Sequence, residues 1–367
     1  MNKRTLSTVI CLLLLCTTPI KAQSLPEISA QSAVVYDTLD GSLLYELRPH
    51  DRRGIASITK IMTALVALEQ YNIHDTVTIQ PEWCGIEGSS MYLKPGEQLQ
   101  ILDLLYGLLL ESGNDAAVAL AGLDPTGTFV DKMNRKAQIL GLADTHFDNP
   151  SGLDGASHYS TAYELAKITA AAMKEPLFAQ IVSTQQIQLA GRTLQNHNRL
   201  LAEIDACGVK TGYTKSCGRC LVSAKEENGR MLICVTLNDR DDWNDHKALL
   251  SYGFFQLENC DLIGAGDCGS VPLISSEKAT ARLYCNESFS CALTQEQQTQ
   301  VSVRLYGPRF VYGSVEAGGY YGTLCVELAG ETLFETSVYF ADTSTEIVTE
   351  RRFPSRLIDF ICRRREH

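Results

Sequence analysis

The stretch Ala56-Ser-Ile-Thr-Lys-Ile-Met-Thr-Ala-Leu-Val-Ala-Leu-Glu69 decides how this chain is organised. Its apolar residues recur at helical spacing, which predicts a buried helix over 57–70. Ser57 stands at the start of that helix and Lys60 follows three residues later, so the two side chains share one face. A serine hydroxyl is a poor nucleophile unless an adjacent base takes its proton. The stretch therefore predicts Ser57 as a nucleophile and Lys60 as its base.

A lysine acts as a base only when it is neutral, and burial or nearby positive charge lowers its pKa. The start of a helix also favours the negative charge that develops on the serine oxygen. The spacing alone is weak evidence, because Ser275-Ser-Glu-Lys278 repeats it. That second copy leads into strand-like residues and has no apolar helix after it. The position of Ser57 before a buried helix is therefore the stronger indication.

Two further short motifs complete a chemical constellation: Ser112-Gly-Asn114 and Lys210-Thr-Gly212. We expect Ser112 to relay a proton toward a leaving amine, and Asn114 to offer amide donors to a substrate backbone. We expect Lys210 to present a fixed positive charge to an anionic substrate terminus and to keep the base neutral.

The residues after Lys210 suit the same substrate. Thr211 adds a hydroxyl for the substrate carboxylate, and Gly212 lets substrate approach the strand without a side-chain clash. The backbone N–H groups of Ser57 and Tyr213 are the expected oxyanion hole.

Longer stretches around these motifs resemble the low-molecular-mass penicillin-binding proteins that are serine-type D-alanyl-D-alanine carboxypeptidases, similar to peptidase family S11. The resemblance covers roughly residues 28 to 257. The matching stretches include ASITKIMTALVALE, GSSMYLKPGEQL, LLYGLLLESGNDAAVALA, MNRKAQILGLADTHFDNPSGLDGASHYSTAYELA, NHNRLL and GVKTGYT followed by CLVSA. It implies an α/β (α+β) β-lactamase/transpeptidase-like domain, with an antiparallel sheet flanked by helices, followed by a small all-β domain.

The same resemblance implies the chemistry. The terminal D-alanine of a peptidoglycan stem pentapeptide would be removed through an acyl-enzyme on Ser57, and β-lactams would acylate the same serine. No metal or organic cofactor is expected. The chain departs from the family pattern at Ile55, where proline is frequent, and at Cys217, where alanine is frequent. Cys217 could add redox sensitivity near the site.

Several alternatives remain open within and outside this chemistry. A class A β-lactamase needs an E-x-x-L-N run between the second and third motifs, and none of Glu164, Glu175 and Glu203 begins one. A D,D-endopeptidase would use the same residues as a carboxypeptidase. A catalytically silent wall-binding protein would have no reason to keep all of the motif residues.

Other polar residues are expected to be structural. The sequence has neither H-E-x-x-H nor G-x-S-x-G, so His158 and His197 are interpreted as structural residues. Asp115 is expected to cap or brace a helix, and Glu111 is a weak candidate for tuning the site.

Thirteen cysteines are present. Cys217-Gly-Arg-Cys220 has no second pair at the spacing of a zinc site, so its thiols are interpreted as ordinary buried or loosely paired thiols. Local disulfides between Cys260 and Cys268, and between Cys285 and Cys291, are possible pairings that the sequence does not decide.

Periodicity predicts the remaining organisation. Strands over 32–37 and 42–47 flank Asp40-Gly41, a good hairpin turn. Helices are expected over 99–110, 116–121, 128–140, 161–173 and 245–257, with strands from 209 to 237. Past residue 260 the pattern becomes short and alternating. We therefore expect a signal peptide (1–22), a catalytic domain (25–257), a β-rich domain (262–342) and a basic amphipathic tail (343–367).

Charge and the two terminal segments indicate an exported protein. Asn2-Lys3-Arg4 precedes a short apolar run, which favours a cleaved signal peptide over a transmembrane anchor. The formal net charge of −11 opposes nucleic-acid binding. The stretch from Arg351 to Arg365 places apolar residues among six arginines, so peripheral contact with an anionic membrane is possible. The expected location is the cell wall or the outer face of the cytoplasmic membrane.

Overall fold

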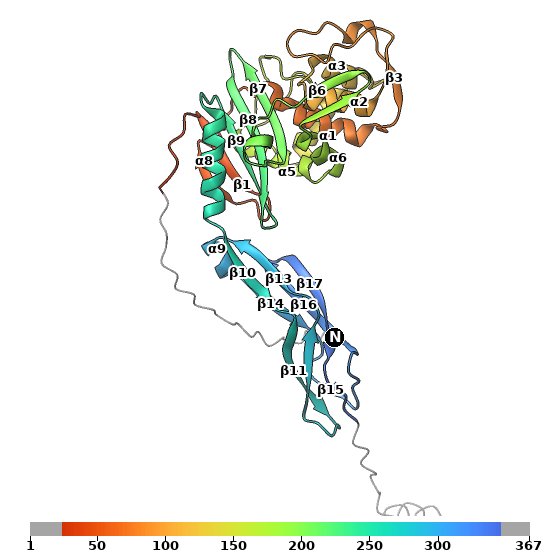
Figure 1. The fold of residues 1–367 in the computed structure, drawn as a ribbon, viewed down its shortest axis with the longest axis vertical. Coiled ribbons are helices and arrows are strands. Elements are labelled where there is room, and N and C mark those ends of the chain that lie inside the picture. Colours follow the sequence, from red (N-terminus) through yellow and green to blue (C-terminus); the bar gives the residue numbers. More distant parts are fainter. Residues whose placement is uncertain (1–23, 346–367) are drawn as a thin grey trace, which may run out of the picture. The chain divides into compact units, whose positions relative to one another are not determined.

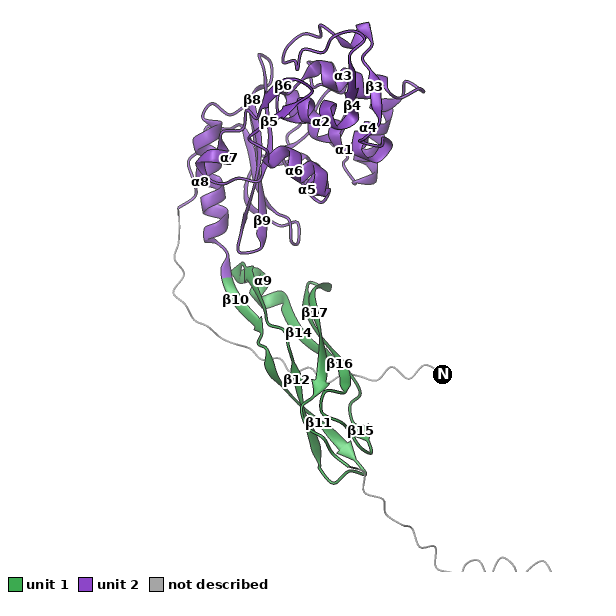
Figure 2. Cartoon of the chain, turned by 45° about the vertical axis from the view of Figure 1, so that its right-hand side comes forward, with its two compact units in different colours: residues 1–19, 259–367 green, residues 20–258 purple. Residues whose placement is uncertain are grey.

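The computed structural model describes residues 24–345, and the chain divides into two compact units between Glu258 and Asn259 (Figure 2). The predicted signal peptide and all but the first residues of the predicted tail lie outside the described residues. Within residues 24–345, no helix has the length and apolar character needed to cross a membrane.

The larger unit is built around an antiparallel sheet of five strands in the order β2-β1-β9-β8-β7 (Figure 1). β1 and β2 form the hairpin predicted around Asp40-Gly41, where Gly41 has a φ of 79°. β7 lies at one edge of the sheet. The strands are β1 (Ser32–Asp37), β2 (Leu43–Leu47), β7 (Gly208–Thr214), β8 (Gly218–Glu227) and β9 (Arg230–Leu237).

Helices cover both faces of this sheet. Successive residues of a strand point to opposite faces, so one strand can contribute to two cores. Val34 of β1 packs into the large helical core, whereas Val35 packs with Leu249 of α8 (Asp242–Phe255). On the helical side, α5 (Ala162–Met173) contacts both β1 and β9. Edge strand β7 lies beside the helical part of the unit (Figure 1).

The helical part is centred on α1 (Lys60–Gln70), whose residues are buried on every side from Lys60 to Ala67. The helix predicted over 57–70 is wrong in its first turn, since residues 56–59 form the 3₁₀ helix η1 and α1 begins only at Lys60. The other helices are α2 (Ile101–Leu109), α3 (Asn114–Gly122), α4 (Phe129–Ile139), α6 (Pro176–Ser183) and α7 (Leu200–Glu203). Short elements complete the unit: η2 (Pro81–Trp83) and the hairpin pairs β3 (Thr76–Thr78) with β4 (Gln98–Gln100) and β5 (Gln186–Leu189) with β6 (Arg192–Gln195).

The smaller unit is rich in strands, as the alternating sequence predicts. A six-stranded sheet has the order β14-β16-β17-β12-β11-β15, and β10 pairs with β13. Val271, Leu283, Val326 and Val338 lie in its core. The strands are β10 (Glu258–Ile263), β11 (Gly266–Ile274), β12 (Thr280–Cys285), β13 (Phe289–Leu293), β14 (Val301–Tyr306), β15 (Val311–Tyr312), β16 (Tyr320–Leu328) and β17 (Glu331–Phe340).

One short helix in this unit, α9 (Gln295–Gln300), is absent from the sequence prediction. Its signal is a capping box, in which the Thr294 hydroxyl accepts from the Gln297 N–H and the Gln297 side chain accepts from the Thr294 N–H. Thr-x-x-Gln at this spacing is a recognised helix start.

No disulfide joins the cysteines of residues 24–345. The pairings suggested for Cys260 with Cys268 and for Cys285 with Cys291 are therefore not formed in this structure. The register of β11 and β12 instead places Cys268 near Cys285, and burial together with the Cys285 thiol raises the pKa of Cys268 to about 12.

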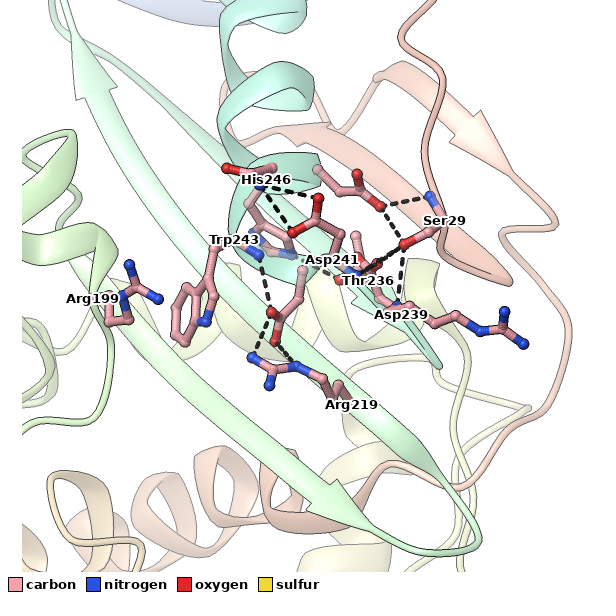
Figure 3. Close-up of polar contacts among 12 residues, drawn as sticks. Ser29, Arg199, Arg219, Thr236, Asp239, Asp241, Trp243 and His246 are labelled. Atoms are coloured by element: carbon pink, nitrogen blue, oxygen red, sulfur yellow. Dashed lines mark hydrogen bonds and ion pairs between the residues drawn. The ribbon is translucent and has the colours of Figure 1, made fainter.

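Ser29 fastens the first described segment to the start of α8 (Figure 3). Its backbone N–H donates to Asp245 Oδ2 at 2.6 Å, and its hydroxyl donates to Asp239 Oδ1 at 2.7 Å. Asp239 is 1% exposed, and no hydrogen-bond donor reaches its Oδ2 among residues 24–345. Burial and the neighbouring Asp245 carboxyl raise the pKa of Asp239 to about 6. Asp239 therefore keeps its proton to a higher pH than an exposed aspartate does.

Replacing Asp239 by Asn is expected to stabilise the protein at pH 8 by on the order of 1 kcal/mol and to leave it nearly unchanged at pH 4. The folded state keeps this proton up to about pH 6, whereas the ordinary pKa is 3.8. Between those values the unfolded state binds fewer protons, so the contribution of Asp239 to the free energy of unfolding falls as pH rises. Urea denaturation at both pH values measures the effect. Asp241→Asn, at an exposed neighbour, is the control; an equal gain from Asp239→Asn at both pH values contradicts the prediction.

Candidate active site

Ser57 lies in the tight turn η1 (Ala56–Thr59), directly before α1. Ala56 enters the turn with a φ of 47°, a left-handed conformation that is uncommon for a residue other than glycine. Side chains three residues apart eclipse one another in a 3₁₀ helix. Lys60 Nζ therefore reaches Ser57 Oγ at 2.8 Å, and Ser57 is the one half-buried residue among the buried residues 55–60.

The Lys60 amine has two other partners, both of them carbonyl oxygens. Asn114 Oδ1 lies 2.7 Å from Nζ and the backbone oxygen of Ser151 lies 2.5 Å away. Carbonyl oxygens only accept, so they take two N–H bonds from Lys60. In the neutral amine the remaining position is a lone pair that points to the Ser57 hydroxyl. The geometry therefore suits transfer of the serine proton to Lys60.

The electrostatics favour that neutral form. Burial is the largest cause that lowers the pKa of Lys60, the positive charge of Lys210 lowers it further, and Asp115 opposes them. Lys210 is also buried, and burial lowers its pKa to about 7. Its Nζ donates to the Thr211 carbonyl oxygen at 3.0 Å.

Edge strand β7 passes very close to the serine turn at Gly212. A Cβ at Gly212 would lie 3.1 Å from the Ser57 nitrogen and 3.2 Å from the Ile55 oxygen. A side chain here would force the serine turn to shift by a few tenths of an ångström, so the protein's own packing favours glycine, as does the substrate approach that the sequence predicts. Thr211 is partly buried beside it, and Tyr213 is 65% exposed.

The turn between α2 and α3 carries the second motif. Ser112 has a φ of 58° and is 6% exposed, and its hydroxyl has no hydrogen-bond partner in the described part of the chain. Asn114 begins α3, and its Nδ2 donates to the Glu87 oxygen at 2.6 Å. One of the two amide hydrogens predicted for substrate is therefore bound within the protein. The structure joins Asn114 to Lys60 directly and leaves the Ser112 hydroxyl without such a link.

A loop in which the sequence predicts no site residue, residues 149–152, holds the lysine from the other side. Asn149 Oδ1 accepts from the backbone N–H groups of Ser151 and Gly152 at 3.1 and 2.8 Å, which shapes the turn. A Cβ at Gly152 would lie 1.9 Å from the Ala56 oxygen. Asn-Pro-Ser-Gly is a recognisable turn sequence, but the Lys60 contact uses a backbone oxygen, for which no side-chain motif exists.

His158 is structural, in agreement with the sequence interpretation. Its Nδ1 accepts from the Asp148 N–H at 3.1 Å, so Nε2 is the donor to Thr59 Oγ1 at 2.7 Å. Burial lowers the pKa of His158 to about 4. Thr59 in turn donates to the Ala56 oxygen at 2.8 Å. A neutral histidine thus braces the back of the serine turn.

Asp115 also braces, as expected: it is fully buried and accepts hydrogen bonds from Ser90 Oγ, Met91 N, Leu93 N and Ala116 N. Glu111 accepts from the Gln195 N–H and lies 3.4 Å from His197, so it ties β6 to the α2–α3 turn. Cys217 lines a cavity of about 280 Å³ together with Ile55, Ala56 and Gly152. Its predicted redox sensitivity stays a prediction.

The comparison with known sequences agrees with this geometry. A family model described as D-alanyl-D-alanine carboxypeptidase, peptidase S11, matches residues 19–241. The D-alanyl-D-alanine carboxypeptidase DacF of Bacillus subtilis is 31% identical over 329 residues, which are 84% of this chain and 84% of that protein. DacD of Escherichia coli is 37% identical over 228 residues, which are 58% of this chain and 59% of that protein.

Solved structures carry the same fold. Penicillin binding protein 5 from Haemophilus influenzae matches with a TM-score of 0.64 and 28% identity, over 89% of this chain and 100% of that one. The Streptomyces K15 DD-transpeptidase matches with a TM-score of 0.61 and 33% identity, over 64% of this chain and 100% of that one. The predicted fold class is confirmed. Since the family model covers more than half of its length, the chain belongs to the peptidase S11 family of D-alanyl-D-alanine carboxypeptidases.

Proposed function

We propose that this chain removes the terminal D-alanine from peptidoglycan stem pentapeptides through an acyl-enzyme on Ser57, and that β-lactams acylate the same residue. The observation that carries the proposal is the arrangement around Lys60 Nζ, in which two carbonyl acceptors leave the lone pair of the neutral amine for the Ser57 hydroxyl.

In the acylation step, Ser57 Oγ attacks the carbonyl carbon of the D-alanyl-D-alanine peptide bond while its proton passes to Lys60. The carbonyl oxygen becomes negative and, in this proposal, accepts from the backbone N–H groups of Ser57 and Tyr213. The close approach of Gly212, the neighbour of Tyr213, to the Ser57 nitrogen supports this assignment. The peptide C–N bond then breaks, and the leaving amine takes a proton through the Ser112 hydroxyl. Water subsequently hydrolyses the ester and restores Ser57.

The free carboxylate of the terminal D-alanine is the feature that a carboxypeptidase must recognise. Lys210 lies on β7 beside the serine turn, and its ammonium has one acceptor, the Thr211 oxygen, among residues 24–345. We assign Lys210 and the Thr211 hydroxyl to that carboxylate. Asn114 retains one amide hydrogen for the substrate backbone.

The rival reactions are less well supported. Of the glutamates between the second and third motifs, Glu164 accepts from the Ala143 and Asp144 N–H groups, and Glu203 pairs with Lys247. These contacts favour structural roles over activation of a deacylating water. An endopeptidase reaction on cross-links would use the same residues and is the second candidate, because no contact in the described residues discriminates the two.

The location follows from the sequence of the terminal segments. We propose export by the N-terminal signal peptide (1–22), catalysis by residues 25–257, and peripheral contact of the basic tail (343–367) with the outer face of the cytoplasmic membrane. The β-rich residues 262–342 stand between catalytic domain and tail in the chain.

Replacing Ser57 by Ala is expected to abolish covalent labelling by a fluorescent penicillin and to lower D-alanine release from a peptide ending in D-Ala-D-Ala by at least about 10³-fold. Ser275→Ala removes the serine of the second Ser-x-x-Lys sequence and is the matched control, with both activities unchanged. Rapid penicillin turnover without D-alanine release would instead indicate a β-lactamase. Absence of labelling in the unaltered protein would indicate the silent scaffold.

The kcat/KM for D-alanine release is expected to fall at both ends of the pH range. Acid protonates Lys60 and removes the base, whereas pH above about 7 removes the charge of Lys210. Since kcat/KM reports the free enzyme, the alkaline limb belongs to Lys210 before substrate raises its pKa. Lys210→Arg keeps the charge and is expected to move the alkaline limb upward by at least about one pH unit. An unmoved alkaline limb in that variant would rule out this role.

A further inference from the structure

The segment Glu87–Glu97 forms two hydrogen bonds with Asn114. The Ser89 oxygen accepts from the Asn114 N–H at 2.7 Å, and the Glu87 oxygen accepts from Asn114 Nδ2 at 2.6 Å. These bonds set the amide so that its Oδ1 faces Lys60. The segment therefore binds Asn114 directly, and Asn114 in turn binds Lys60, the proposed base.

This segment contains no helix or strand, so side chains from elsewhere must hold it. Gly88 and Gly96 have positive φ, and so does Tyr92, at 61°. Close packing at one end limits its freedom, because a Cβ at Gly88 would lie 2.7 Å from Asn114 Nδ2. A loop of this kind opens at low free-energy cost unless it is fastened.

The inner side of the segment is fastened by Asp115 of α3. This fully buried carboxylate accepts from Ser90 Oγ at 2.6 Å and from the N–H groups of Met91 and Leu93, both at 3.0 Å. All three contacts are charge-assisted, and they come from the residue next to Asn114.

The outer side is fastened by one arginine from the β5–β6 hairpin. The guanidinium of Arg192 donates through Nε to the Met91 oxygen at 2.9 Å and through Nη2 to the Tyr92 oxygen at 3.0 Å. It also forms a two-bond pair with the Glu97 carboxylate, at 2.6 and 2.7 Å. The side chains of Arg192 and Glu97 are only 16% and 22% exposed, which makes this pair stronger than an open surface pair.

We propose that Arg192, with Glu97 as its anchor, is a positioning residue for acylation: it closes the 87–97 segment over Asn114 and thereby holds Asn114 Oδ1 against Lys60. The inference rests on the proposed role of Ser57 and Lys60. Neither Arg192 nor Glu97 forms a hydrogen bond or ion pair with Ser57 or Lys60, so their effect passes through the segment.

The consequence for the base is specific. Burial is the largest cause that keeps the pKa of Lys60 low. The charged or titratable groups around it are Lys210 on β7, Asp115 on α3 and His158 in the loop before α5. A segment that lifts away from Asn114 admits water toward Lys60 and moves its pKa back toward 10.5, while these three groups stay in place. The acid limb of the acylation rate then shifts to higher pH.

The test measures the second-order rate constant of labelling by a fluorescent penicillin from pH 5 to 9, together with the final number of labelled serines per chain. Arg192→Ala is expected to lower the rate constant at pH 7 by roughly 10- to 100-fold and to move the acid limb upward, with full final labelling. Glu97→Gln is expected to give a smaller change in the same direction. Arg282→Ala is the matched control, because it removes a two-bond arginine pair with Asp342 in the β-rich unit.

Each outcome separates the two proposals. Unchanged rate constants and acid limbs in Arg192→Ala and Glu97→Gln overturn the positioning role while leaving the Ser57 acyl-enzyme intact. A lower final labelling with an unchanged rate constant in the labelled fraction also overturns it, since that result means only partial folding. If Arg192→Ala does not fold, the nearly isosteric Glu97→Gln decides. Failure of the unaltered protein to label overturns the proposed function itself.

Discussion

The buried amine of Lys60 is the constraint on which the catalytic unit depends. An amine removed from water must find partners for its hydrogens and its lone pair, or the burial costs several kcal/mol. Three segments that are far apart in the sequence supply them: the serine turn, the start of α3 and the loop at Ser151. The burial that makes these partners necessary also lowers the pKa of Lys60. Burial therefore both demands the three contacts and favours the neutral amine that the proposed base needs.

The backbone of each of these segments is shaped by that requirement. Ala56 and Ser112 adopt positive φ, and Gly152 sits where any side chain would collide with the Ala56 oxygen. Unfavourable backbone conformations persist only where surrounding contacts over-determine them. Here the surrounding contacts are hydrogen bonds, such as those of His158 with Thr59 and of Asn149 with the Ser151 turn. The hydrogen bonds of His158 and Asn149 thus hold the strained turns that carry Ser57 and Ser151.

A contact in the site can be predicted from the sequence when it joins two side chains whose spacing along the chain has one structural meaning. A contact made by a backbone group cannot. Ser57 and Lys60 are predictable because three-residue spacing in a helical turn has one geometric meaning, whether that turn is α or 3₁₀. Strands β1 and β2 are predictable from alternation and from the turn at Gly41. The Ser151 oxygen and the loop carbonyls that hold Asn114 are not, because every residue carries the same carbonyl and only the fold selects one.

The predicted role of Asn114 shows the same limit in a side chain. Its amide was expected to face substrate, yet the structure uses its oxygen for Lys60 and one hydrogen for Glu87. Residue type establishes which donors and acceptors exist, but long-range packing decides their partners. The smaller unit shows the same limit. Its strands can be predicted from the alternating sequence, but the approach of Cys268 to Cys285 depends on a bulge in β11, which the alternation does not predict.

Two buried lysines in one site would be costly if both were charged, and their surroundings assign them opposite forms. Two carbonyl oxygens accept the two hydrogens of a neutral Lys60 amine, and the Ser57 hydroxyl faces its lone pair. These three partners satisfy the neutral amine completely. Lys210 has a single acceptor among the described residues, the Thr211 oxygen, so its ammonium is incomplete without an anion. In the proposed reaction a substrate carboxylate would supply that anion and favour the proton on Lys210, while a charged Lys210 favours a neutral Lys60. Binding of the peptide terminus proposed above would therefore hold the positive charge on Lys210 and, through that charge, favour the neutral Lys60 that the proposed reaction uses as its base.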